Sequence, residues 1–101
     1  MLVIPLDRPH VLPFMMPARF KTDVAYFMTP AGEPGVPPLG AGEYFIRTEN
    51  AKKWLDELVV SVVSPLSMKT AEIELTEDQE AWLRWLIEHD IQHVRLEEAS
   101  H

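Results

Sequence analysis

Proline recurs every four residues at the start of this chain, at Pro5, Pro9, Pro13 and Pro17. Because proline fixes φ and has no backbone N–H, residues 1–17 are expected to form neither a helix interior nor a central strand. The residues between the prolines are mostly apolar, which is not typical of a disordered tail. We therefore predict an extended apolar arm that lies against its own core or against another chain.

Composition limits the class of protein. The chain has 101 residues, which predicts one domain, 1–101, and it has no cysteine, which fits a reducing cytoplasm. No apolar run approaches the length of a membrane span, and a net charge of −7 is poorly suited to a phosphate backbone. We expect a soluble cytoplasmic protein with no nucleic-acid or membrane partner.

Proline and glycine divide the chain, since eight of nine prolines and all four glycines fall within residues 5–42. Residues 20–28 alternate between two sets of side chains and predict a strand. Residues 29–42 contain four prolines and four glycines and predict a loop without regular structure. A loop of this length is uncommon in a compact domain, which makes it a candidate functional segment.

Regular structure is expected mainly after residue 42. Residues 43–47 indicate a strand, and a short helix with Thr48 or Asn50 as its N-cap follows. Residues 58–63 are apolar on both faces, as in a central strand, and residues 70–75 alternate with Ala71 and Ile73 inward. The short connection between these two segments predicts an antiparallel hairpin.

The best-specified helix follows Thr76. Thr76 and Gln79 fit a capping box, and the helix should end near His89–Asp90, before a last strand over residues 91–96. From residue 43 the order is β-α-β-β-α-β, but the first crossover, residues 48–57, is short for joining parallel strands. We predict an α+β fold with a mixed or mainly antiparallel sheet of about four to six strands and two helices on one face. The ferredoxin-like order is one version of it.

The sequence predicts no catalytic residue, metal site or cofactor. His89 and His93 have ligand-like spacing, but Asp90 and the β-rich run after it indicate that the helix stops between them. No serine lies in G-x-S-x-G, and the glycine-rich loop has no phosphate-binding motif. The chain has many carboxylates, but their spacing in the sequence does not identify any two as a pair for acid–base chemistry.

The apolar arc of the helix after Thr76 covers about 200°, counted at about 100° per residue, which is wider than packing on one sheet requires. We therefore expect a small non-catalytic protein that acts through protein–protein association, as a homodimer using its N-terminal arm. An extended segment of seventeen residues reaches roughly 50 Å, and exchange of such arms produces a two-fold dimer. The predicted partner-binding residues are Phe14, Met15, Met16, Trp82 and Trp85.

An alternative is a small ligand-binding protein or enzyme with its site under the loop 29–42. Long loops carry function more often than the elements they connect. The polar residues expected to contact the ligand are Arg19, Tyr44, Arg47 and His93. A pocket lined by these residues, with a strongly shifted titratable group, would favour this alternative.

Overall fold

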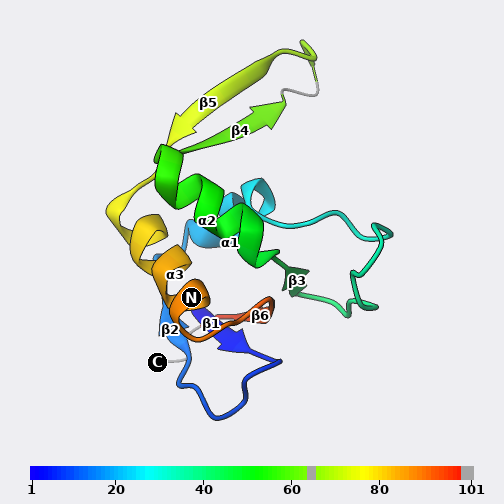
Figure 1. Cartoon of the computed structure of the whole chain (residues 1–101), viewed down its shortest axis with the longest axis vertical. Coiled ribbons are helices and arrows are strands. Elements are labelled where there is room, and N and C mark those ends of the chain that lie inside the picture. Colours follow the sequence, from blue (N-terminus) through cyan, green and yellow to red (C-terminus); the bar gives the residue numbers. More distant parts are fainter. Residues whose placement is uncertain (64–65, 99–101) are drawn as a thin grey trace.

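Strand β6 (His93–Glu97) is paired on both sides in the computed structural model, which describes residues 1–63 and 66–98. The sheet order is β2-β1-β6-β3, and each neighbouring pair is antiparallel. The other strands are β1 (Leu2–Pro5), β2 (Phe14–Met15) and β3 (Glu43–Phe45). The first and last strands of the chain are therefore neighbours (Figure 1).

Strands β4 (Val59–Val63) and β5 (Thr70–Glu74) form an antiparallel hairpin, as expected, but this hairpin is a sheet of its own. Helices α2 (Thr48–Glu57) and α3 (Glu77–Glu88) lie between this hairpin and the four-stranded sheet (Figure 1). A short helix, α1 (Phe20–Asp23), continues into the 3₁₀ turn η1 (Val24–Tyr26). The α+β class is thus confirmed, with three α-helices and two antiparallel sheets in the described part of the chain.

The ferredoxin-like order is not confirmed, because β4 and β5 do not join the sheet that contains β3 and β6. The expectation of a central strand over residues 58–63 is wrong, since among the described residues β4 pairs with β5 alone. Leu58 ends α2 in the left-handed conformation (φ 60°) and remains 48% exposed. The hairpin follows directly from this turn. Ala71 and Ile73 share a face with the buried Val60, but β5 is exposed along its length, so these two residues are not buried as expected.

The N-terminal segment belongs to the sheet of its own chain, so the expectation that it would contain no interior strand is wrong. β1 lies between β2 and β6, and Val3 is fully buried. The Leu6 N–H donates to the His93 carbonyl at 2.9 Å, and antiparallel alternation then points the Pro5 nitrogen away from β6. On that other side β2 has already ended, so the missing N–H of Pro5 interrupts no hydrogen bond of the sheet.

The predicted strand over residues 20–28 is also wrong, because residues 20–26 of this segment are helical. Its buried residues are Phe20, Val24 and Phe27, spaced by four and three, which is the period of a helix and not of a strand. The same segment also shows the alternation of a strand, and burial against α3 decides between the two patterns. Residues 29–42 contain neither helix nor strand, as expected.

The starts of the two long helices differ. At α3 the predicted capping box is confirmed: Thr76 Oγ1 accepts from Gln79 N at 3.1 Å, and Thr76 N donates to Gln79 Oε1 at 3.0 Å. At α2 the N-cap is Arg47, without a side-chain cap, so the expected cap at Thr48 or Asn50 is wrong. Helix α3 is thus the helix whose beginning is encoded locally.

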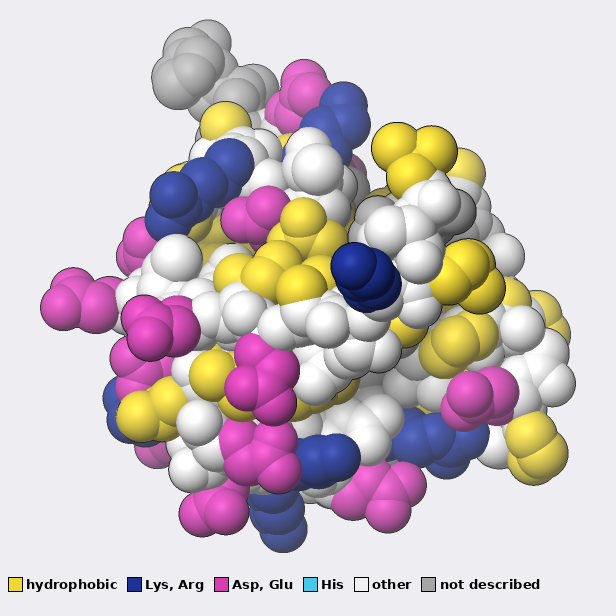
Figure 2. Space-filling view, turned by 90° about the horizontal axis from the view of Figure 1, so that it is seen from above, with side chains coloured by type: hydrophobic (Ala, Val, Ile, Leu, Met, Phe, Trp, Pro, Cys, Tyr) yellow, Lys and Arg dark blue, Asp and Glu magenta, His cyan; other side chains and the backbone are white. Residues whose placement is uncertain are grey.

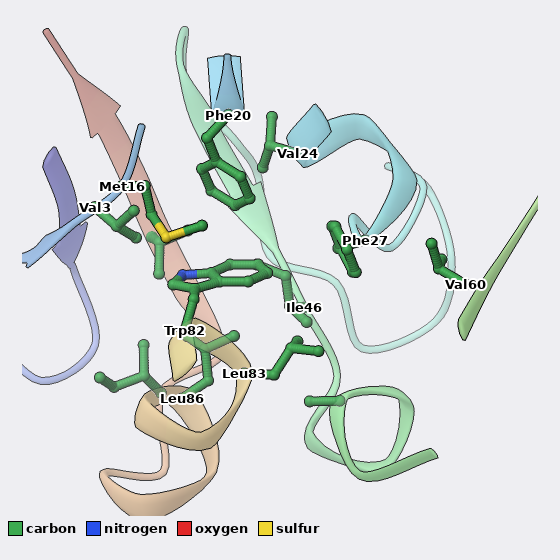
Figure 3. Close-up of a cluster of buried hydrophobic side chains, with 13 residues drawn as sticks. Val3, Met16, Phe20, Val24, Phe27, Ile46, Val60, Trp82, Leu83 and Leu86 are labelled. Atoms are coloured by element: carbon green, nitrogen blue, oxygen red, sulfur yellow. The ribbon is translucent and has the colours of Figure 1, made fainter. Parts of the chain in front are cut away.

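Trp82 on α3 occupies the centre of the core. Its ring meets Phe20 at 4.7 Å and Phe27 at 5.5 Å between ring centroids, both edge-on. Met16 from the arm lies beside the indole, and Leu86 lies below it in the view of Figure 3. The arm, the turn before the loop and α3 are therefore held together at one side chain.

Trp82→Ala is expected to lower the free energy of unfolding by about 3–5 kcal/mol, because it opens a cavity where these segments meet. The matched control is Trp85→Ala on the same helix, where the side chain is only partly buried and the loss should be smaller. Urea denaturation followed by circular dichroism measures both. Equal losses would contradict the central place given to Trp82.

Candidate functional site

One side of the arm and the end of α3 enclose a shallow hollow of about 370 Å³. We call its lining the arm surface, which consists of His10, Val11, Leu12, Trp85 and His89. Leu12 is 83% exposed, and Phe14 adjoins the hollow through its ring contact with Trp85, at 5.3 Å between centroids. An apolar lining with two imidazoles fits an apolar side chain from a partner better than a charged ligand.

The structure separates the five residues predicted to bind a partner. Phe14 and Trp85 meet at the arm surface, whereas Met16 and Trp82 are buried within the core of their own chain. Met15 is exposed, but alternation along β2 turns it to the face of the sheet opposite Phe14. The wide apolar arc of α3 is thus covered on its second side by the arm of the same chain, with Trp85 left at the edge.

The loop 29–42 is tied back to the start of α2 by Arg47. Its guanidinium donates to the Pro34 carbonyl and lies 3.7 Å from the Glu33 carboxylate. Gly35 adopts a positive φ of 86°, and a Cβ there would lie 3.5 Å from the same guanidinium. One side chain therefore holds the middle of the loop.

The end of the loop is held by Glu43. Its carboxylate lies 2.8 Å from His93 Nε2, and a Cβ on Gly40 would come within 2.6 Å of its other oxygen. Any larger residue at position 40 would therefore require the Glu43 carboxylate to move. A hydrogen bond from the Gly40 backbone, and then the hydrogen bond from His93, hold the pKa of Glu43 below its ordinary value.

The four residues of the alternative ligand site do not converge. Arg47 and His93 both contact the loop or its end. Tyr44 packs against the core, on the opposite side of β3 from the Glu43–His93 pair. Arg19 precedes α1 and lines a separate depression with Gln79, so it shares none of the contacts of the other three.

His89 and His93 fall on different elements, as expected. Helix α3 ends at Glu88, His89 is its C-cap beside Trp85, and His93 begins β6. Within residues 1–63 and 66–98, no group of three or more potential ligands is placed to hold a metal ion. In the same residues no helix has both the length and the apolar character needed to cross a membrane.

Sequence reasoning missed His10, Val11, Leu12 and His89 as parts of one surface. Their common feature is contact between the first turn after β1 and the last turn of α3, which lie far apart along the chain. No local pattern signals such a contact. The pairing of Glu43 with His93 was missed for the same reason, since it depends on the register of β3 with β6.

Replacing Glu43 is expected to change stability in a pH-dependent way. The pKa of Glu43 is lower in the folded chain than the unfolded value of 4.5, so its charged carboxylate stabilises the fold at pH values above 4.5. This stabilisation is lost as the pH falls through the folded pKa. Glu43→Gln should therefore be less stable than the natural chain at neutral pH, with the difference shrinking below pH 4.5.

Urea denaturation at a series of pH values tests this difference. Glu49→Gln, an exposed carboxylate on α2, is the control for loss of one negative charge. A difference between Glu43→Gln and the natural chain that stays constant from pH 7 to the acid range would contradict the role of the Glu43–His93 pair.

Neither a family model, nor a curated protein, nor a solved structure matches this chain.

Proposed function

We propose that this protein is non-catalytic and acts through protein–protein association, as a cytoplasmic homodimer whose contact uses the outer side of its N-terminal arm. The observation that carries this proposal is the arm surface, where Leu12 is 83% exposed beside a hollow lined by Val11 and Trp85. Large apolar side chains in water next to an aromatic hollow are typical of association sites.

A two-fold contact suits this geometry. In an isologous dimer each copy offers the same patch, so Leu12 of one copy can enter the hollow of the other, and the reverse. Burying one leucine side chain is worth about 1.5–3 kcal/mol, and a two-fold axis uses each such contact twice. The imidazoles of His10 and His89 lie at the same surface and can take hydrogen bonds there.

The arm cannot be removed to test this proposal. β1 lies between β2 and β6, and Val3 and Met16 are buried, so deletion of residues 1–17 would take a strand and part of the core with it. The test must therefore change the outer side of the arm alone.

Leu12→Asp is expected to convert the assembly to smaller species, since it places a charge in the proposed contact without touching the core. Sedimentation velocity over a range of protein concentrations measures the mass. Ala31→Asp is the charge-matched control on the exposed loop and should behave as the natural chain does. A natural chain that stays monomeric at every concentration would contradict the proposal.

A ligand site at the loop 29–42 is the second candidate. It is supported by the Glu43–His93 pair, because shifted titratable groups gather at functional sites, and by Arg47 beside the loop. Titrating a set of small anions while recording ¹H–¹⁵N spectra tests it. Shifts centred on Arg47 and His93 would favour this function, and their absence would count against it.

A further inference from the structure

We infer that the free edge of β4 is a second self-association site, through which β4 pairs antiparallel with β4 of another copy. Together the two hairpins would form one continuous sheet in the order β5-β4-β4-β5. This contact is separate from the arm surface and goes beyond the proposed function. A chain that uses both surfaces assembles beyond a dimer.

The register of the hairpin decides which backbone groups of β4 are free. Leu75 N donates to the Leu58 carbonyl at 3.0 Å, and Val60 is opposite Ile73. Antiparallel alternation then directs the N–H and C=O of Val60 toward β5, and those of Val59, Ser61 and Val63 away from it. No other described element bonds the outward groups of these three residues, so they form an unpaired strand edge.

Charge distinguishes the two edges of the hairpin. β5 carries Glu72 and Glu74, and charged residues on an edge strand oppose pairing with another copy. β4 reads Val-Val-Ser-Val-Val, with no charge, proline or glycine, and Val63 is 59% exposed. An uncharged, β-branched edge with free backbone groups lacks the usual protection against strand addition.

A second copy is the occupant that fits this edge best. With the two-fold axis at Ser61, each Ser61 lies opposite its equivalent, and Val59 of one copy lies opposite Val63 of the other. Every outward N–H and C=O then finds a partner, no like charges meet, and the smallest side chain of the strand lies at the axis. In contrast, the same operation on β5 would bring acidic side chains of two copies together.

The pairing would also extend an apolar face. Val60 and Val62 of β4 share one face of the hairpin with Ala71 and Ile73 of β5. At present Ile73 is partly in water, and hydrophobic side chains reach the surface in several groups at this end of the molecule (Figure 2). In the proposed sheet Val60, which is already buried in the core of its own chain, is next to Val62 of the other copy, so the apolar faces of the two hairpins adjoin.

Ser61→Pro is the sharpest test, because the Ser61 N–H points away from β5. Proline removes that donor and places its ring at the free edge of β4, where a second strand would have to pair. The hydrogen bonds between β4 and β5 stay in place. Ser61→Ala keeps the N–H and is the matched control. Ser61→Lys is a second, independent variant that keeps the backbone but sets two like charges opposite each other at the axis.

Sedimentation velocity over a range of concentrations, with circular dichroism to confirm folding, measures the outcome. We expect the natural chain and Ser61→Ala to assemble beyond two copies, and Ser61→Pro and Ser61→Lys to lose the larger species and stop at a dimer. Amide exchange at Ser61 should slow as the natural chain is concentrated, and this slowing should be absent from Ser61→Lys.

The outcomes separate the two proposals. If Ser61→Lys assembles as the natural chain does, pairing at β4 is overturned, whether or not Ser61→Pro folds. If Leu12→Asp alone reduces the assembly, the arm contact stands and the β4 contact is overturned. If the Ser61 variants alone reduce it, the β4 contact stands and the arm contact is wrong. A natural chain that is monomeric at every concentration overturns both.

Discussion

The fold depends on the burial of one side chain, Trp82. The indole is fully buried, with Phe20 and Phe27 edge-on to it and Met16 beside it, so the arm, the turn at residues 20–26 and α3 reach their places together. The pairing of β1 with β6 fixes the position of the arm as well, because it joins the first strand of the chain to the last. A chain of this size has a modest core, and here it is assembled from segments far apart in sequence.

This arrangement also determines what remains for association. Because Met16 and Val3 are committed to the core, the arm contributes only its outer side, Leu12 and its neighbours, to any partner. The hairpin reaches that core through Val60, and the outward backbone groups of β4 have no hydrogen-bond partner among the described residues. The two proposed contacts therefore use groups that the burial around Trp82 leaves free, namely the outer side of the arm and the backbone edge of β4.

Prediction from sequence succeeded where a pattern is local. The capping box at Thr76 and the hairpin of β4 and β5 were both expected, because helix starts and short connections are encoded by neighbouring residues. It failed for residues 20–28, whose apolar pattern fits both the period of a helix and that of a strand. It also failed for Pro5, because the effect of a missing N–H on a strand depends on which side of that strand is paired. At the arm surface Phe14 and Trp85 were expected, but the lining by residues 10–12 was not.

The sequence by itself determined that the second part of the chain carries most regular structure and that the longest helix begins directly after Thr76. Both follow from local features, namely the concentration of proline and glycine before residue 43 and the hydrogen bonds of the capping box. Tertiary structure decided that the arm is covered by its own chain and that β4 stands outside the main sheet. Which strands pair and which side chains are buried together depends on contacts between segments far apart in the sequence, above all those that bury Trp82. Local sequence patterns do not predict such contacts.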